Sequence, residues 1–286
     1  MIRVLKLELK KSLKNKLFFF VIIVGFLITV LSFLYNLEVH TKDLNSMLEY
    51  EDKTSILSNH LIGLSTLFNH WIGGESYTLG STIYFYIFPI MVAIPYGWSY
   101  CTELKSGYIK NMVIRTGNFN YYIGKYVATF ISGGLAMIIP LVLNIMLVAS
   151  FIPALKPDPA YMPFYGVFPF SFMSQLFYTK PILYVLIYIF IDFIFCGLIA
   201  CISYAIANLI KNNIVVILFP FASILGVHYL SSFFLEKVKF ELSPLTILHP
   251  PTTYAVSGYI IMIEIALLFS LTFLTTVIRG LKHEVY

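Results

Sequence analysis

Charged residues are scarce in this chain. Asp, Glu, Lys and Arg together make up 12% of its 286 residues, while 59% are hydrophobic. Water-soluble globular domains average about 25% charged and roughly 45–50% apolar residues. The shortage of charge excludes an ordinary water-soluble globule and indicates a protein that lies in a lipid bilayer.

Cysteine and the usual catalytic patterns are also rare or missing. The three cysteines, Cys101, Cys196 and Cys201, fall at or inside apolar stretches, so they predict neither a disulfide framework nor a metal site. His60 and His70 stand singly, without the spacing of metal ligands. Zinc-protease, nucleophile-elbow and paired-carboxylate arrangements are missing, which argues against an enzyme.

A phosphate-binding P-loop is missing as well. The nearest approach to G-x-x-x-x-G-K-[ST] runs from Gly117 to the tripeptide GKY at Gly124. Its gap is wrong, and Tyr126 stands where a hydroxyl for magnesium is required. The chain is therefore expected to bind no ATP, metal or other cofactor of its own.

Apolar runs of membrane-crossing length are what the sequence has in abundance. Roughly 20 mostly apolar residues cross the hydrocarbon core of a bilayer as a helix. The runs are continuous rather than alternating, which argues against a barrel. They predict an all-α membrane protein, a single transmembrane domain over 1–286 built as a six-transmembrane-helix bundle. The predicted spans are 17–37, 81–100, 126–150, 181–208, 214–233 and 257–278.

The distribution of basic residues predicts the orientation. With the N-terminus inside, thirteen of the 19 Lys and Arg fall in short cytoplasmic segments and six fall outside, as the positive-inside rule requires. Both termini are then cytoplasmic, and the net charge of +5 implies no nucleic-acid partner. The connection 101–125 is cytoplasmic, and 38–80, 151–180 and 234–256 are extracellular.

The first 16 residues predict a helix that lies in the headgroup plane of the membrane and contacts its lipids. One face is apolar and the opposite face is basic. The alternative is that the lysines only flank the first span and set its orientation. The apolar face holds Ile2, Leu5, Leu9 and Leu13, and the basic face holds Arg3, Lys6, Lys10 and Lys14.

Each outer connection carries a distinct pattern. The connection 151–180 is rich in proline and aromatic residues and is expected to cap the outer end of the bundle. The connection 234–256 contains the break Pro250-Pro251 and is compatible with a short dip into the membrane. The connection 38–80 has apolar residues at helical spacing that predict packing on the bundle: Leu57, Leu61, Leu64 and Phe68.

Prolines and glycines interrupt several predicted spans. Such residues free backbone carbonyls and favour bends that neighbouring helices must satisfy. Either a bundle that moves or a bundle with fixed kinks is compatible with them. They are Pro89, Pro95, Gly133, Gly134, Pro140 and Pro220.

The cytoplasmic connection 101–125 predicts a short helix with one apolar face, which ends at Thr116-Gly117-Asn118. Lys105 and Lys110 point away from that face. A partner or the membrane surface is the only visible cause for the apolar face. Its members are Leu104, Tyr108, Ile109, Met112 and Val113.

This segment resembles the corresponding loop of type-2 ABC exporter permeases. The family pattern is a Glu, a Gly-Thr pair, a leucine-rich helical turn, an Arg and a Lys further on. Here Glu103 is followed by Ser106-Gly107, by YIKNMVIR ending at Arg115, and by Lys125. The basic first helix, the predicted spans and the long first outer connection agree with the family topology.

Two positions depart from the family pattern. Tyr108 stands where the family favours Thr, and Thr116-Gly117 stands where a Pro is frequent. These departures leave the subfamily undefined.

The resemblance implies a permease subunit of an ATP-binding cassette exporter in a bacterial cytoplasmic membrane. ATP and magnesium would bind a separate ABC ATPase subunit, and a second permease, identical or paralogous, would complete the complex. The segment after the second span would be the coupling helix that docks on the ATPase. The implied docking residues are Glu103, Lys105, Gly107, Tyr108, Met112 and Arg115.

A few polar residues lie within the predicted spans. An ionised carboxylate that faces lipid costs at least about 2.5 kcal/mol, so Asp192 and Glu264 must face protein or water. Tyr188, one turn from Asp192, is placed to bind its carboxyl. With Asn144, these residues either line a translocation path or fasten helices by hydrogen bonds.

The cargo and the energy source remain expectations at this point. Aromatic outer segments and a nearly charge-free interior favour an amphipathic or hydrophobic cargo, such as a peptide, an antibiotic or a lipid-like molecule. The alternative function is an ion-coupled secondary transporter or channel that acts without an ATPase, in which Asp192 binds an ion or a proton.

Overall fold

The protein is built from helices. The computed structural model describes residues 1–54, 65–75, 77–159, 167–168, 171–238, 241–249, 251, 256–278 and 280, and every regular element within them is helical. The helical spacing expected at Leu57, Leu61 and Leu64 lies outside these residues, as does Pro250.

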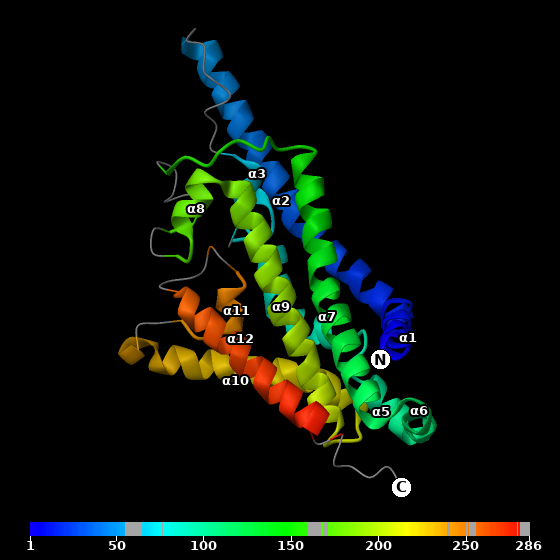
Figure 1. Ribbon diagram of the computed structural model, residues 1–286. Helices are drawn as coiled ribbons and strands as arrows, with labels where there is room; N and C mark the ends of the chain where they lie inside the picture. Colours follow the sequence, from blue (N-terminus) through cyan, green and yellow to red (C-terminus); the bar gives the residue numbers. More distant parts are fainter. Residues whose placement is uncertain are drawn as a thin grey trace.

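The helices follow one another with mostly short connections (Figure 1). The last helix continues into one turn of π-helix, Leu274–Ile278. The elements are α1 (Ile2–Leu13), α2 (Lys16–Thr54), α3 (Leu67–His70), α4 (Leu79–Ala93), α5 (Ser99–Lys105), α6 (Tyr108–Thr116), α7 (Asn118–Ala149), α8 (Ser174–Thr179), α9 (Pro181–Ala207), α10 (Asn213–Val238), α11 (Pro244–Ile247) and α12 (Gly258–Phe273).

Five helices of the described part are long and apolar enough to cross a membrane. This number agrees with a multi-pass membrane protein and with most of the predicted spans, which matched apolar runs to the thickness of a bilayer. The five are α2, α7, α9, the part of α10 from Asn213 to Phe233, and α12 extended to Val277.

The second predicted span, 81–100, differs from the structure. Helix α4 ends at Ala93, a turn follows, and α5 begins at Ser99. Pro95 explains the end of α4, because proline has no N–H to continue the helical hydrogen bonds. The 15 residues of α4 extend roughly 22 Å at 1.5 Å per residue, so the count of six spans stays a prediction.

Helix α2 is much longer than the predicted first span. It runs for 39 residues, roughly 58 Å, and its second half projects beyond the other helices in Figure 1. Residues 38–54 of the expected outer connection are therefore helical. Two exposed ion pairs one helical turn apart support this part: Glu38 with Lys42 at 2.6 Å and Glu49 with Lys53 at 3.4 Å.

The centre of the bundle is the packing of α7 against α9. Gly133 and Gly134 of α7 and Gly197 of α9 let the two backbones approach closely, since a methyl group added at Gly133 would lie 2.3 Å from the Cβ of Ala200. Helix α7 is continuous through Gly133, Gly134 and Pro140. The small size of these glycines serves helix packing, as is common between membrane helices, and a bend at these positions stays a prediction.

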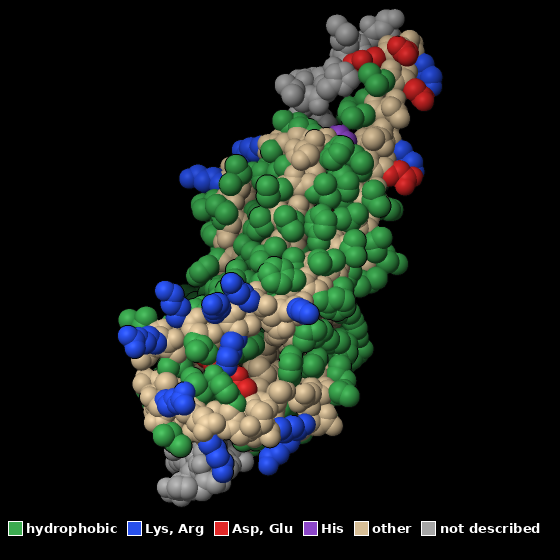
Figure 2. Space-filling model, turned by 90° about the vertical axis from the view of Figure 1, so that its right-hand side faces the viewer, with side chains coloured by type: hydrophobic (Ala, Val, Ile, Leu, Met, Phe, Trp, Pro, Cys, Tyr) green, Lys and Arg blue, Asp and Glu red, His purple; other side chains and the backbone are tan. Residues whose placement is uncertain are grey.

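The surface divides into three zones along the long axis (Figure 2). Most of the visible Lys and Arg gather at the end that carries α1, α5 and α6, which we call the basic end. The opposite end carries α3 and the end of α2 and is called the far end. Between them lies a hydrophobic zone without charged side chains, as expected of a surface covered by a membrane.

The glycine at the α7–α9 contact yields a stability prediction. Gly133→Ala should lower the thermal unfolding midpoint, because its methyl group would overlap Ala200 and overpacking typically costs about 1–3 kcal/mol. Gly226→Ala in α10 is the matched control. No atom lies within 4 Å of the added methyl group there, so alanine should be neutral or stabilising by up to about 1 kcal/mol. Unfolding is followed in detergent by size-exclusion chromatography after heating, and equal midpoints for the two variants would contradict the packing role.

Candidate functional site

Two glycines delimit the segment that resembles a coupling helix. Gly107 and Gly117 have φ angles of 70° and 80°, which glycine adopts at little cost because it lacks a Cβ. Gly107 separates α5 from α6, and Gly117 separates α6 from α7. The segment is therefore a nine-residue helix held between two tight turns.

The apolar face of this segment turns inward. Ile109 is only 1% exposed, and Leu104, Met112 and Val113 pack against a cluster of buried tyrosines on α5, α7 and α9. The expectation that a partner or the membrane surface must cover this face is wrong. The face is apolar because it packs on the core of the chain itself, which includes Tyr100, Tyr121, Tyr122 and Tyr204.

Four charged side chains meet where α1, α5 and α7 come together. We call Glu8, Lys11, Glu103 and Lys125 the charge network. The Nζ atom of Lys125 lies 2.8 Å from Oε2 of Glu103 and 3.6 Å from Oε2 of Glu8. The side chains of Lys125 and Glu8 are both 0% exposed. Lys125 thus contacts two acids from two different helices inside the protein.

Lys11 completes the charge network from the solvent side. Its Nζ atom lies 3.3 Å from Oε1 of Glu8 and 3.1 Å from Oε1 of Glu103. It also lies 4.0 Å above the ring of Tyr108, a cation–π contact. With two lysines and two glutamates the charge network is formally neutral, which is the condition for burying ionised groups.

Two tyrosine hydroxyls donate to the carboxylate oxygens that face Lys125. The hydroxyl of Tyr96 donates to Oε2 of Glu8 at 2.5 Å, and that of Tyr121 donates to Oε2 of Glu103 at 2.5 Å. Burial alone would raise the pKa of the Glu103 carboxyl, but Lys125 and Lys11 outweigh it and hold the pKa below its usual value. Glu103 is therefore ionised at neutral pH.

Helix α1 is fixed to the bundle by further contacts. The side-chain amide of Asn15 donates to the carbonyl of Pro95 at 2.8 Å, while its Oδ1 accepts from the N–H of Leu17 at 3.1 Å. A methyl group added at Gly124 would meet the side chain of Val4 at 3.2 Å, so α1 packs closely on α7. The face of α1 that enters the bundle is Val4, Glu8 and Ser12.

The residues predicted to dock on a partner fall into two groups. Lys105 and Arg115 are exposed, whereas Tyr108 and Met112 are half-buried. Glu103 is directed into the charge network, and Gly107 forms the turn before α6. The structure therefore brings Glu103 and Tyr108 together on Lys11 and leaves the two cations at the surface.

Sequence reasoning missed half of the charge network. Glu8 was assigned no role, and Lys11 and Lys125 were treated only as topological or motif residues. A signal was present, because Glu8 is the lone acid of segment 1–16 and Glu103 is the lone acid of 101–125. A single acid within a basic segment is a candidate for a long-range ion pair.

The outward face of α6 is basic with an apolar centre. Lys110, Asn111 and Arg115 are exposed, and Ile114 is 83% exposed. Phe119, just beyond Gly117, is half exposed. We call Lys105, Lys110, Ile114 and Arg115 the α6 outer face. Single apolar side chains are common on protein surfaces, so this face is a candidate docking surface through its place in the loop that resembles a coupling helix.

Asn144 has a structural role. Its Oδ1 accepts from the N–H of Ile72 at 2.9 Å, and its amide donates to the carbonyl of Thr29 at 3.0 Å. Both functions of the side chain are used on backbone groups, so it joins α2, α7 and residues 65–75 rather than facing a path. This outcome corresponds to the fastening role that the sequence left open.

Residues 65–75 are completely buried at the far end. Glu75 is 1% exposed, and its carboxylate accepts from the hydroxyl of Ser32 at 2.8 Å and from the backbone N–H groups of Tyr77 and Thr78 at 2.9 and 3.0 Å. A fourth bond comes from the Thr78 hydroxyl. The sequence placed this acid in an outer loop and did not predict its burial.

Asp192 and Glu264 are both shielded. Asp192 is 2% exposed, and its Oδ1 has no hydrogen-bond partner among the described residues. The expected bond from Tyr188 is not formed there; Tyr188 packs against Tyr184 instead, with ring centroids 4.7 Å apart. Both carboxyl oxygens of Glu264 likewise lack a partner in the described ranges. Neither acid joins the charge network.

No family model, no curated protein and no solved structure matches this chain. The likeness to type-2 ABC permeases therefore stays a prediction from the 101–125 loop and the topology. No cluster of three or more metal-binding side chains occurs among the residues described.

The charge network yields a second stability prediction. Lys125→Met should lower the free energy of unfolding by about 3–5 kcal/mol, since it leaves Glu8 and Glu103 to share the single cation Lys11 and gives the buried charge network a net negative charge. Adding Glu103→Gln should recover part of the loss, because it restores the balance of one acid and one cation. Lys42→Met, which breaks an exposed pair, should change the unfolding midpoint little. If Lys125→Met and Lys42→Met unfold at the same temperature, Lys125 does not hold the helices together.

Two buried histidines at the far end predict a pH dependence. Burial lowers the pKa of His70 and of His249 from 6.5 to about 4. Nε2 of His249 donates to the carbonyl of Glu75 at 2.6 Å, and its ring stacks on Phe85. Between pH 6.5 and 4 the unfolded chain binds protons that the folded chain does not, so stability decreases as the pH falls through this window.

The measurement compares thermal unfolding at pH 7 and pH 5. Each histidine should contribute on the order of 2 kcal/mol to the loss. His249→Gln keeps a donor for the carbonyl of Glu75 and removes the titrating ring, so it should flatten the pH dependence. An unchanged slope in His249→Gln would show that this histidine is already protonated or exposed.

Proposed function

We propose that this chain is the transmembrane permease subunit of an ATP-driven exporter and that the α6 outer face docks on a separate ABC ATPase. One observation carries the proposal: an exposed face with an isoleucine between cations is mounted rigidly on the bundle by the buried charge network. A rigid attachment is what transfer of force from a partner requires.

The charge network supports a lever that moves as one body. Glu103 at the end of α5 is bound to Lys125 in α7 and to Lys11 in α1, and the inward face of α6 is packed on the tyrosine cluster. Displacing α6 therefore displaces the ends of α1 and α7. Helix α7 then carries the movement along its 32 residues toward the far end.

The remaining parts of the proposal follow the family resemblance. ATP and magnesium bind the ATPase subunit, and a second permease, identical or paralogous, completes the transporter in a bacterial cytoplasmic membrane. The cargo is an amphipathic or hydrophobic molecule such as a peptide, an antibiotic or a lipid.

A second candidate function rests on Asp192. A fully buried carboxyl with an unpartnered oxygen in a membrane-crossing helix is the feature expected of an ion or proton site. It favours an ion-coupled transporter or channel that works without an ATPase. In that case Asp192→Asn abolishes gradient-driven transport by the purified chain alone, whereas the permease proposal requires nucleotide hydrolysis by a partner.

The docking prediction concerns the exposed cations of α6. The double substitution Lys110→Glu with Arg115→Glu should weaken binding of the ATPase subunit about tenfold or more, because it reverses two charges at the centre of the proposed contact. Binding is measured by co-purification and by titration of the labelled ATPase that co-purifies with the wild-type chain. The folded state is checked by the unfolding midpoint, since neither side chain is buried.

Lys211→Glu is the matched control. Lys211 is an exposed cation in the connection between α9 and α10, outside the α6 outer face, so its reversal should leave binding unchanged. The proposal fails if the wild-type chain purifies alone and transports alone, or if reversal at Lys211 weakens the complex as much as reversal on α6.

A further inference from the structure

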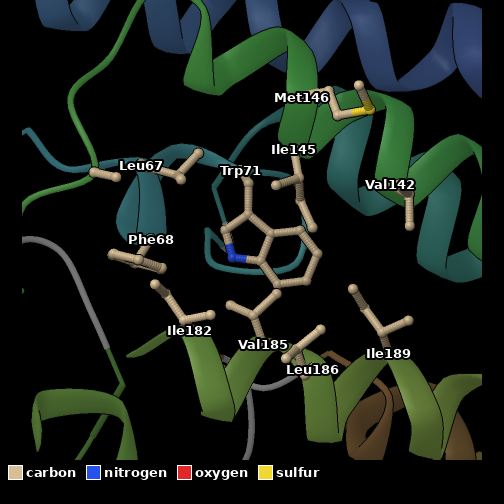
Figure 3. Close-up of a pocket in the computed structure, with 11 residues that line it drawn as sticks. Leu67, Phe68, Trp71, Val142, Ile145, Met146, Ile182, Val185, Leu186 and Ile189 are labelled. Carbon is tan, nitrogen blue, oxygen red and sulfur yellow. The ribbon is translucent and has the colours of Figure 1, made fainter. Parts of the chain in front are cut away.

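An elongated groove lies at the far end, between α7, α9 and the buried residues 65–71. Its inner section has a volume of about 300 Å³ and is lined only by apolar side chains and the indole of Trp71. Figure 3 shows the indole at the centre, with Ile145 of α7 on one side and Val185 of α9 on the other. This volume is at the lower end of the range for small-molecule sites.

The groove opens toward the membrane. Three side chains that line the inner section are largely exposed on the surface, Met146 at 63%, Ile182 at 66% and Leu186 at 58%. They lie on membrane-crossing helices, so hydrocarbon chains of the bilayer reach the opening directly. The inner section fits an apolar chain that enters sideways.

A second section continues the groove to the polar edge. It has a volume of about 560 Å³ and shares Phe68 and Ile182 with the inner section. Lys156 and Lys180 line it. Both lysines are exposed, and neither side chain forms an ion pair or a hydrogen bond in the part of the chain that is described. The groove therefore passes from an apolar interior to a mouth with two available cations.

One polar group stands between the two sections. The indole N–H of Trp71 makes no hydrogen bond among the residues described, although buried indoles usually find an acceptor. In Figure 3 its nitrogen lies on the side of Phe68 and Ile182, two of the four residues that line both sections. From the interior to the mouth, the groove therefore offers an apolar site, then the indole N–H donor of Trp71, and then the two cations Lys156 and Lys180.

We propose that this groove binds an anionic phospholipid from the leaflet at the far end. The acyl chain lies in the inner section, an ester carbonyl accepts from the indole of Trp71, and the phosphate lies between Lys156 and Lys180. Charge complementarity selects this occupant over a second copy of the chain, because the described part of the mouth presents two cations and no anionic partner for them. The site is independent of the proposed function, since it requires neither an ATPase nor transport.

The chain offers a built-in reporter for this site. Trp71 and Trp98 are its only tryptophans, and Trp98 lies in the turn before α5, near the basic end. Trp98→Phe leaves Trp71 as the sole tryptophan, and excitation at the red edge of the indole band avoids the tyrosines. The purified full chain is placed in vesicles that contain phospholipids with brominated acyl chains, which quench a nearby indole.

Brominated phosphatidylglycerol should quench Trp71 at least twofold more than brominated phosphatidylcholine at the same mole fraction. Lys156→Gln with Lys180→Gln should bring this ratio close to one. Lys42→Gln with Lys53→Gln is the matched control, because it removes two exposed lysines of the far end that do not line the groove, and it should keep the preference. Val142→Phe fills the inner section and should reduce quenching by both lipids.

Equal quenching by the two lipids in the parent protein would overturn the proposal. An unchanged preference for phosphatidylglycerol after Lys156→Gln with Lys180→Gln would also overturn it. So would an equal loss of this preference after Lys42→Gln with Lys53→Gln. If neither lipid quenches Trp71 and the chain forms a dimer that Val142→Phe disrupts, the groove binds a second copy and the lipid site is refuted.

Discussion

The burial of Lys125 between Glu8 and Glu103 is the constraint on which the basic end depends. An ion in a protein interior is tolerated only when its charge and its hydrogen bonds are matched, and here the matching groups come from three different helices. Separating any one of α1, α5 and α7 from the other two would leave a buried charge without its partner. The three helices are therefore coupled more tightly than apolar packing alone would make them.

The far end is organised on another principle. There the buried carboxylate of Glu75 accepts hydrogen bonds from hydroxyl and backbone N–H groups, and Asn144 binds the backbone of Ile72 and Thr29. Such hydrogen bonds fix residues 65–75 in place. One end of the bundle thus responds to ionic conditions and the other to protonation of His70 and His249.

Local patterns predicted most helices because the length of an apolar run and the thickness of a bilayer decide them. The sequence showed that Pro95 would interrupt its span, but it did not show that α4 would end there. The pairing of Glu8 with Lys125 was not predictable from periodicity, since it joins residues far apart in the chain. The apolar face around Ile109 was found correctly, but its partner was the tyrosine core, which only the tertiary structure brings together.

The contact of Asn15 with Pro95 has a mechanical consequence. Asn15 stands at the junction of α1 and α2, beside the charge network, and α2 then continues without interruption to Thr54. A tilt of about 5° at this junction swings the tip of a rod of roughly 58 Å by about 5 Å. Small adjustments on one face of the membrane therefore become large excursions on the other.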